Sequence, residues 1–404
     1  MKPTVVIIGA GSAGLVAAAA LLDRGVDSVV LEQGDRVATS WRQRHEDLRL
    51  NTIRWLSGLP GPAIPRHAGR WVSRDDYVAY LERYASRQAL DIRFGVRARR
   101  LTPTARGWRV GTDAGPYEAA HVIVATGNDR VPWQPDLPGL AAFGRPVRHV
   151  AELRRAADLA GRRVLLIGAG NSAVEIAGHL VDHGVAQLWT SIRRPPNILP
   201  RQLWGIPLHP VTVALRYLPE RLRDRLAQAI SRYAFGDLSP YGLPAAADGP
   251  FRRMRTSGMT AAIDQGFVDH LVAGRLRIVA DVTRLIPNEA VLRDGLHVEP
   301  DVIVTATGYR SGLADLLGPL GVLDRHQRPR TGKGREALPG LWLTGFWPAI
   351  EGNLRQHGRE ARHIADVSVW CSVIPASASS SNGMGLLRKW ILLVDDHVPW
   401  DVGT

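Results

Sequence analysis

The 404-residue sequence is nearly without cysteine and lysine. Its single cysteine, Cys371, can form no disulfide within the chain and excludes a Cys-x-x-Cys redox centre. The lysines are Lys2, Lys333 and Lys389, so the formal net charge of +13 comes almost entirely from arginine. These arginines are scattered along the chain, whereas a nucleic-acid-binding surface requires basic residues gathered on one face. We therefore expect no nucleic-acid partner, and we expect some arginines to contact anionic cofactors.

Long apolar runs are also scarce, and the one near the N-terminus has a second explanation. Residues 5–22 are uncharged and mostly apolar, which is the pattern of a membrane span or a signal segment. Gly9, Gly11 and Gly14 interrupt this run at the spacing of a phosphate-binding turn. A strand, a glycine turn and a helix account for these glycines, and a membrane helix does not. We therefore expect no integral membrane association and a cytoplasmic location, which also suits a single free thiol.

An internal repeat organises the sequence. A buried strand, a Gly-rich turn and a helix occur first over residues 5–22 and again in RVLLIGAGNSA, which begins at Arg163. Each copy continues with short alternating strands, IRFGV and WRVGT in the first copy and LRIVADV and AVLRDGLHV in the second. Each then closes with an apolar strand, HVIVATG in the first copy and DVIVTATG in the second. Continuous Val/Ile runs bounded by glycine are typical of parallel strands covered on both faces. The predicted fold class is α/β, with two doubly wound, Rossmann-like dinucleotide-binding units.

The repeat also sets the expected domain boundaries. We assign residues 1–150 and 305–375 to the first unit and residues 151–304 to the second, because a proline-rich connector precedes the second copy. A helical insertion is expected over about residues 195–260. Residues 376–404 are expected to be a C-terminal tail that begins as a flexible linker.

One helix is expected inside the insertion. Residues 211–234 carry apolar residues at helical spacing with arginines between them. A surface helix packed on the core and a membrane-surface or substrate-gating helix both fit this pattern.

The first Gly-rich turn reads Gly9-Ala10-Gly11-Ser12-Ala13-Gly14. In such a turn the first glycine permits the tight bend, the second lets the backbone approach a pyrophosphate, and the third allows close packing of helix on strand. The N-terminus of the helix that follows favours an anionic group. Glu32 ends the next strand, where a carboxylate can accept hydrogen bonds from a ribose diol. The combination predicts a dinucleotide, which we assign to FAD.

The second turn reads Gly168-Ala169-Gly170-Asn171-Ser172-Ala173, with alanine at the tolerated third position. Its following strand ends without a carboxylate, and Arg193 and Arg194 come next. A carboxylate would repel a 2′-phosphate, whereas guanidinium groups bind one bidentately. We therefore predict NADPH at this turn, with the alternative that one arginine of the pair lies in solvent.

Five segments in order resemble the flavin-containing monooxygenases and their bacterial flavoprotein relatives. Within residues 3–366 they are SWRQRHEDLRLNT (40–52), GAGNSAVEIA (168–177), SIRRPPNILPR (191–201), ATGYRSGL (306–313), and GLWLTGFWP followed by GNL (340–354). Disulfide reductases share the plan of two dinucleotides but need the thiol pair that is missing here. In the family that the segments resemble, NADPH reduces FAD, and a C4a-peroxyflavin then delivers one atom of molecular oxygen to a small organic substrate.

The resemblance also implies site residues. Asn51 matches the family's catalytic asparagine beside the flavin, with the alternative that it merely caps a turn. Trp41 would pack against the flavin, with the alternative that it belongs to the core. The further cofactor-binding residues implied are Gln33, Ser40, Thr52, Val96, Ala125, Thr126, Gly127, Thr307, Gly308, Gly345 and Leu354. No metal site is expected.

The linker between the units departs from the family pattern Phe-x-Gly-x-x-x-His-x-x-x-aromatic. Phe143 and His149 match this pattern, but Arg145 stands in place of the glycine and Leu153 in place of the aromatic residue. The motif of the ketone-oxidising (Baeyer-Villiger) members is therefore not satisfied. His149 fits either a catalytic or cofactor-positioning role or a structural one.

Two further departures lie before Asn51. Ala38-Thr39 replaces the usual Gly-Gly, and His45 stands where a tyrosine is usual.

The expected function is that of an FAD-dependent, NADPH-driven monooxygenase, with substrate identity and the type of oxygenation left open. One alternative is an NADPH-dependent flavin reductase or dehydrogenase that oxygenates nothing. The other is a non-catalytic flavoprotein that acts as a sensor or assembly subunit.

Overall fold

The computed structural model describes residues 4–349 and 352–373. Its first sheet contains six strands in the order β22-β23-β7-β1-β2-β3. The strands are β1 (Val5–Ile8), β2 (Ser28–Leu31), β3 (Ile92–Arg93), β7 (His121–Val124), β22 (Glu336–Leu338) and β23 (Leu341–Leu343). Only the β22–β23 pair is antiparallel. The N-terminal strand and helix predicted from the glycine spacing are confirmed.

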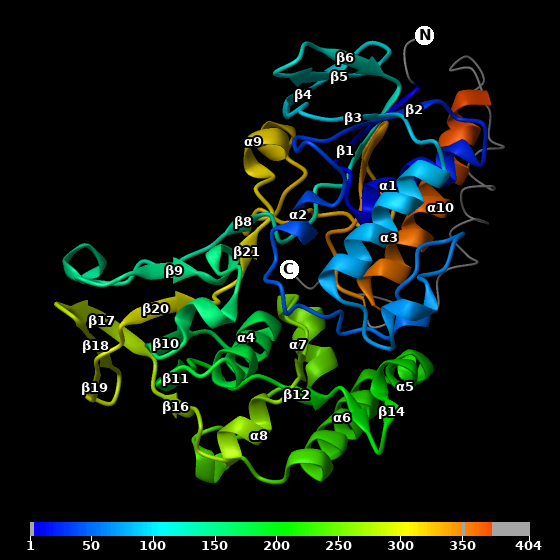
Figure 1. Ribbon diagram of the computed structural model, residues 1–404. Helices are drawn as coiled ribbons and strands as arrows, with labels where there is room; N and C mark the ends of the chain where they lie inside the picture. The colour runs from blue at the N-terminus through cyan, green and yellow to red at the C-terminus, as the bar shows by residue number, and fades with distance from the viewer. Residues whose placement is uncertain (1–3, 350–351, 374–404) are drawn as a thin grey trace.

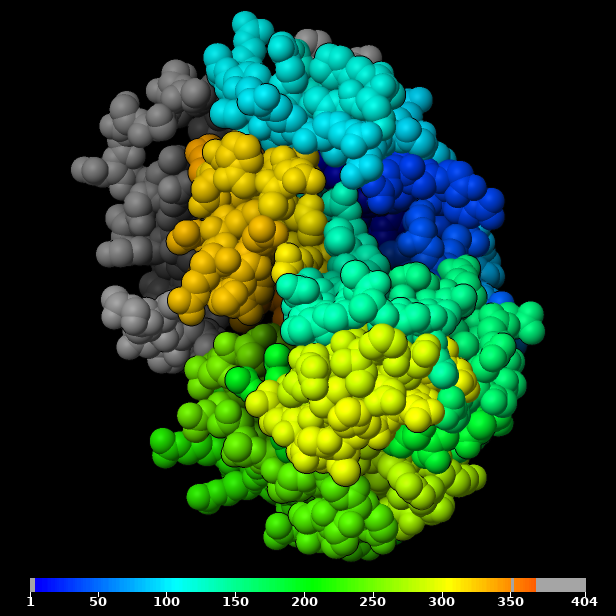
Figure 2. All heavy atoms as spheres, turned by 90° about the vertical axis from the view of Figure 1, so that its left-hand side faces the viewer, coloured from blue at the N-terminus to red at the C-terminus, as the bar shows by residue number. Residues whose placement is uncertain are grey.

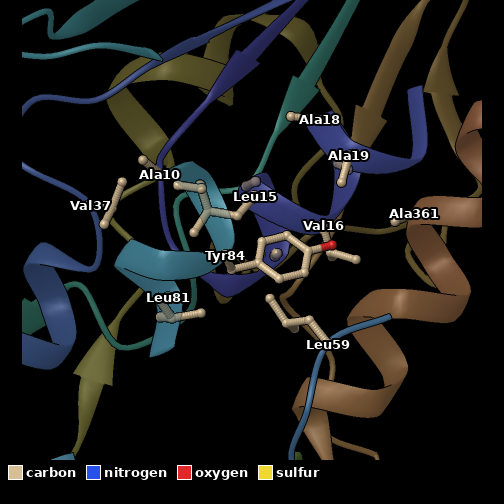
Figure 3. Packing of buried hydrophobic residues seen from close by; sticks show 14 of the residues in the cluster. Ala10, Leu15, Val16, Ala18, Ala19, Val37, Leu59, Leu81, Tyr84 and Ala361 are labelled. Carbon is tan, nitrogen blue, oxygen red and sulfur yellow. The ribbon is translucent and has the colours of Figure 1, made fainter. Parts of the chain in front are cut away.

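Helices cover one face of this sheet (Figure 1). They are α1 (Ser12–Leu22), α3 (Arg74–Arg87) and α10 (Asn353–Val373). Helix α1 is buried from Ser12 to Leu21, which explains why its sequence is apolar on every side. Figure 3 shows Val16 and Leu15 of this helix packed among Tyr84 and Leu59.

Short strands and a helical turn cover the opposite face of the first sheet. They are β4 (Ala98–Thr104), β5 (Gly107–Thr112), β6 (Tyr117–Ala119) and α9 (Ala314–Leu317). Trp108 and Val110 of β5 pack there with Val6 and Ile8 of β1. The parallel strands are therefore covered on both faces, as their continuous apolar runs predict.

The second sheet repeats this plan in the order β16-β11-β10-β20-β9, with every pair parallel. The strands are β9 (Val147–His149), β10 (Arg163–Ile167), β11 (Gln187–Ser191), β16 (Arg277–Val279) and β20 (Val302–Thr305). Helices α4 (Asn171–Asp182) and α8 (Phe267–Val272) pack on one face. The sheet of β17 (Val282–Ile286), β18 (Glu289–Leu292) and β19 (His297–Val298) packs on the other. The prediction of two doubly wound units is confirmed.

Two expected strands of the second unit are each divided. The segment LRIVADV supplies β16 and the start of β17, which belong to different sheets, and AVLRDGLHV forms the β18–β19 hairpin. Short alternating runs show where chain is extended, but they do not show where it turns into a neighbouring sheet.

The chain crosses between the units twice. At the crossing, β8 (Val131–Pro132) pairs antiparallel with β21 (Tyr309–Arg310), and the pair lies between the two large sheets in Figure 1. Strand β9 already pairs with β20 of the second sheet, although it precedes the boundary expected at residue 150.

Most of the insertion lies at the lower right of the molecule in Figure 1. Its elements are β12 (Ile198–Pro200), β13 (Gln202–Leu203), β14 (Ile206–Pro207), α5 (Leu208–Ala214), α6 (Glu220–Phe235), α7 (Pro250–Ser257) and β15 (Ala262–Asp264). The single helix expected over residues 211–234 is wrong, because α5 ends at Ala214 and α6 begins only at Glu220. Pro219 lies before α6, where a proline can start a helix but cannot continue one.

The short helical turns complete the described chain. They are α2 (Thr39–Arg42) and the 3₁₀ turns Arg54–Leu56, Arg66–Ala68, Leu140–Ala142, Val150–Glu152, Ala156–Leu159, Leu215–Tyr217, Ser239–Tyr241 and Gly318–Leu320. None of the helices in the described ranges combines the length and apolar composition that a bilayer crossing requires. The expected tail over residues 376–404 lies outside the described residues.

Candidate nucleotide and oxygenation site

Each glycine of the first turn meets the steric demand that its position implies. Gly9 has φ +108, and a Cβ there would lie 2.8 Å from the carbonyl oxygen of Ala125. A Cβ on Gly14 would lie 1.9 Å from the carbonyl oxygen of Gly9, so helix α1 packs too closely for any side chain. A Cβ on Gly11 would meet no atom of the described residues within 4 Å. The first and third glycines of the turn therefore lie in close contact with neighbouring backbone. The second glycine leaves free space, where a pyrophosphate must approach.

The surroundings of the turn fit a bound nucleotide. No side chain of the described residues caps the N-terminus of α1, which leaves its first N–H groups to an anion. The Thr126 hydroxyl lies next to Gly9 and is buried without a hydrogen-bond partner in the part of the chain that the structure describes. Figure 2 shows a hollow on this side of the molecule, between the blue N-terminal segment and the teal segment that follows β6.

Glu32 follows β2 and is buried against the turn. Its carboxylate accepts hydrogen bonds from the backbone N–H of Ala10 at 2.7 Å and of Gly34 at 2.8 Å. The hydroxyl of Thr39 donates to the same group at 3.3 Å. Glu32 thus fixes the backbone of the turn. Its carboxylate oxygens have further lone pairs, which can accept hydrogen bonds from a ribose.

The other residues predicted to bind FAD lie around this turn or at the crossing. Gln33 follows β2, Val96 follows β3, and Ala125 and Gly127 follow β7. The backbone N–H of Val96 donates to the carbonyl of Glu32 at 2.9 Å. Trp41 stacks edge-on against Tyr77 at 4.8 Å between ring centroids, so it packs on the core.

Two predicted contacts lie on the helical side of the turn. A Cβ on Gly345 would come within 2.8 Å of the Ala13 side chain, and Leu354 is buried in α10. Sequence reasoning missed His357 of α10, whose Nδ1 lies 3.1 Å from the Ser12 hydroxyl. Burial lowers the pKa of His357 to about 4, so this histidine is neutral. Its position beside a Gly-rich turn carries no signal in the sequence.

The second turn repeats the backbone of the first. Gly168 has φ +141, with a Cβ position 2.4 Å from the carbonyl oxygen of Ala306, and Gly170 faces open space. Ala173 occupies the third position and is buried. Within residues 4–349 and 352–373, no side chain caps α4 either. The Asn171 side chain binds within the protein, donating to Ala261 and Thr260, so only its backbone is left for a phosphate.

The strand register identifies the residue that corresponds to Glu32. Ile8 of β1 pairs with Leu31, and Ile167 of β10 pairs with Ser191 in the same way. Ile192 therefore takes the place of Glu32 in the second unit, and the exposed Arg193 and Arg194 follow it. This edge of the second sheet therefore presents an apolar side chain and two guanidinium groups.

Asn51 lies where the two units meet. Its Oδ1 accepts from Gln265 Nε2 at 3.0 Å, and its Nδ2 donates to Asn171 Oδ1 at 3.3 Å. Both ends of the Asn51 carboxamide bind side chains of the second unit. These contacts do not fit the alternative that Asn51 merely caps a turn. The next residue, Thr52, shares a hydrogen bond of 2.6 Å with the Ser57 hydroxyl. Ser40 lies in α2, on the same connection.

Arg201 and Gln265 were missed from the sequence. Arg201 Nη1 donates to Gln265 Oε1 at 2.8 Å, and Nη2 donates to the carbonyl of Leu50 at 2.7 Å. The guanidinium lies 4.1 Å from the Trp71 ring centroid. Burial lowers the pKa of Arg201 to about 10, which leaves it charged at neutral pH. Arg201 is the last residue of SIRRPPNILPR, one of the segments that carry the family resemblance. That position could have identified it as a candidate site residue.

The altered linker is held by structural contacts. Both ring nitrogens of His149 are engaged, Nδ1 by the N–H of Ala151 and Nε2 by the carbonyl of Gly308, each at 3.1 Å. The structure therefore favours the structural role for His149. Arg145 donates to Asp301 at 2.8 Å, so it ties the linker to the second unit. Thr307 donates to the carbonyl of Trp133 at the same crossing.

Comparison with known proteins agrees with this geometry. Residues 6–194 match the family model described as pyridine nucleotide-disulphide oxidoreductase, although the cysteine pair is missing here. Indole-3-pyruvate monooxygenase YUCCA1 of Oryza sativa subsp. japonica is 34% identical over 85% of this chain and 86% of its own. Probable indole-3-pyruvate monooxygenase YUCCA1 of Arabidopsis thaliana is 31% identical over 84% of each chain.

Solved structures share the fold. A flavin-containing monooxygenase from Stenotrophomonas maltophilia superposes with a TM-score of 0.71, at 24% identity over 92% of this chain and all of that one. An open structure of cyclohexanone monooxygenase gives a TM-score of 0.67, at 19% identity over 92% of this chain and 88% of that one. With the relatives above, the chain belongs to the flavin-containing monooxygenases, FAD- and NADPH-dependent enzymes that insert one oxygen atom into a small organic substrate.

Proposed function

We propose that the substrate of this enzyme is a 2-oxo acid with an aromatic or other apolar side chain. The observation that carries the proposal is the 34% identity, over 85% of the chain, with a relative named for indole-3-pyruvate, which is such an acid. The departures at Arg145 and Leu153 disfavour simple ketones as substrates, since they remove the motif of the ketone-oxidising members. Molecular oxygen is the second substrate under this proposal.

We assign the two nucleotides to the two turns. The open Gly11, the uncapped α1 and the carboxylate of Glu32 support FAD at the first turn. The open Gly170, with Arg193 and Arg194 after β11, supports NADPH at the second. The domain division proposed with them places FAD in residues 1–150 and 305–375 and NADPH in residues 151–304. We also propose the cytoplasm as the compartment, because it keeps a lone thiol reduced.

Under this proposal the protein's residues bind and orient the reactants, and the cofactors carry the redox chemistry. Bound FAD supplies the activation of oxygen, and NADPH supplies the reducing equivalents. The N–H groups at the start of α1 and α4 hold the phosphates. Asn51 Nδ2 carries two hydrogens, and its bond to Asn171 uses one, so the other can donate to an oxygen atom at the reaction centre.

Product analysis of the purified holoenzyme tests the proposal. With NADPH, oxygen and indole-3-pyruvate, we expect one oxygenated product for each NADPH oxidised. A panel of amines, sulfides and cyclic ketones provides the controls. Turnover of the amines or sulfides with none of the 2-oxo acid would reject the proposed substrate class. NADPH oxidation that yields only hydrogen peroxide with every compound would reject oxygenation by this chain.

A further inference from the structure

Asn51 belongs to a chain of side chains whose hydrogen bonds all run in one direction. Arg201 Nη1 donates to Gln265 Oε1 at 2.8 Å, and Gln265 Nε2 donates to Asn51 Oδ1 at 3.0 Å. Asn51 Nδ2 donates to Asn171 Oδ1 at 3.3 Å, and Asn171 Nδ2 donates to the carbonyl oxygen of Ala261 at 2.9 Å. The chain begins at a guanidinium and ends at a backbone carbonyl.

The two ends dictate the direction of every bond between them. A guanidinium can only donate and a carbonyl can only accept, whereas a carboxamide has one end of each kind. Gln265 must therefore turn its oxygen to Arg201 and its nitrogen to Asn51. Asn51 must in turn present its oxygen to Gln265 and its nitrogen to Asn171. Without these ends, each carboxamide could turn over and still make hydrogen bonds.

Arg201 is itself held firmly. Its second amino group donates to the carbonyl of Leu50, the residue before Asn51, and its guanidinium stacks on Trp71. The arginine therefore fixes the backbone next to Asn51 as well as the side chain of Gln265. Asn171 is fixed at the other end, because its Oδ1 also accepts from the N–H of Ile263 at 2.9 Å.

We propose that Gln265 and Arg201 are positioning residues that turn an N–H of Asn51, and not its carbonyl oxygen, towards the reacting atoms. The inference rests on the role proposed above for Asn51. Because Asn171 lies in the second Gly-rich turn, the same chain ties the orientation of Asn51 to the NADPH-binding unit.

Gln265→Glu is the discriminating variant. A carboxylate still accepts from Arg201, but it can no longer donate to Asn51, so the Asn51 carboxamide must turn over to donate to it. The Asn51 oxygen then faces the Asn171 oxygen or the reaction centre. Arg201→Lys is the independent second variant, because an ammonium keeps the charge without a planar fork that spans Gln265 and Leu50. Gln228→Glu, at an exposed position of α6, is the matched control.

Two measurements on the FAD-loaded proteins separate positioning from folding. The first is the anaerobic rate of flavin reduction by NADPH, which the oxygen-facing group does not control. The second is the oxygenated product formed per NADPH with indole-3-pyruvate, the remainder being measured as hydrogen peroxide. For Gln265→Glu and Arg201→Lys we expect the product per NADPH to fall by about tenfold or more, as loss of one preorganised donor implies. Flavin reduction should stay within about twofold, and adding Gln265→Glu to Asn51→Ala should cost nothing further.

The outcomes distinguish this inference from the proposed function. If Asn51→Ala loses product but Gln265→Glu and Arg201→Lys keep the wild-type yield, the positioning role is wrong and the function stands. If the double variant is clearly worse than Asn51→Ala, Gln265 acts by another route and the inference is again overturned. A wild-type enzyme that forms peroxide and no product from any compound would overturn the function and the inference together.

Discussion

The two Gly-rich turns have the same backbone and differ in what surrounds it. Both have a first glycine with positive φ pressed against the closing strand, and both have a second glycine that faces open space. At the third position the first turn has no space for a Cβ on Gly14, whereas the second turn buries the Cβ of Ala173. Beyond the next strand, the first unit offers Glu32 and the second offers Ile192 followed by two arginines. Under the proposed assignment, the glycines make a dinucleotide site, and the residues at the end of the second strand select which dinucleotide binds there.

The largest effect is expected where the two turns differ in packing. Gly14→Ala places a Cβ 1.9 Å from the carbonyl oxygen of Gly9, so α1 must move away from β1. We expect about 3 kcal/mol of destabilisation or more, because overpacking a rigid backbone contact cannot be relieved by a rotamer change. Thermal unfolding and FAD content of the purified protein measure it. Gly11→Ala is the matched control, which should fold normally and only bind FAD more weakly. Equal stability of the two variants would contradict the packing difference.

The second-largest effect is expected for Glu32→Ala. It leaves the N–H groups of Ala10 and Gly34 without their carboxylate and removes the group proposed to bind the ribose. An unsatisfied buried donor costs about 1–3 kcal/mol, so we expect FAD binding at least about tenfold weaker. Titration of the apoprotein with FAD provides the measurement, and Asp35→Ala, an exposed carboxylate nearby, provides the control. FAD affinity at the wild-type level would show that Glu32 serves the fold alone.

Arg193 and Arg194 test the other side of the comparison. A charged hydrogen bond contributes about 1.5–3 kcal/mol, so replacing an arginine that binds the 2′-phosphate by alanine should raise the KM for NADPH by about tenfold or more. The KM for NADH should not change, since NADH has no 2′-phosphate. The two single variants show whether one arginine or both take part. If neither changes the ratio of NADPH to NADH efficiency, the assignment of the second turn to NADPH loses its support.

The smallest effect concerns the linker between the units. Hydrogen bonds from the side chain and backbone of Arg163, with the charge of Arg145, lower the pKa of Asp301 from 3.8 to about 2. Because the folded-state pKa is the lower one, the contribution of Asp301 to stability is present above the unfolded pKa and is lost as the pH falls towards about 2. Asp301→Asn should therefore lower the free energy of unfolding by about 1 kcal/mol at neutral pH. The difference from the wild type should shrink as the pH falls towards the folded-state pKa of about 2. Chemical unfolding at several pH values checks this, and a pH-independent difference would exclude the charge as the cause.

The sequence predicted the local features well because their causes are local. Glycines at fixed spacing and apolar runs of four residues report backbone demands and burial within a few positions, so β1, α1 and the second turn follow directly. The break at Pro219 was also local and could have been recognised. The contacts around Asn51 could not be predicted, since Gln265 and Arg201 lie 214 and 151 positions away from their partners Asn51 and Leu50. Polar pairs of this kind are brought together only when the two units dock.

We propose that NADPH at the second turn reduces FAD at the first, and that one oxygen atom is then inserted into a substrate. The direct test supplies the FAD-loaded enzyme with NADPH, isotopically labelled molecular oxygen and indole-3-pyruvate, and follows product mass and peroxide together. We predict one labelled oxygen atom in the product for each NADPH oxidised and little peroxide. Rapid flavin reduction followed by peroxide alone, with no labelled product, would contradict the account and identify the protein as a flavin reductase.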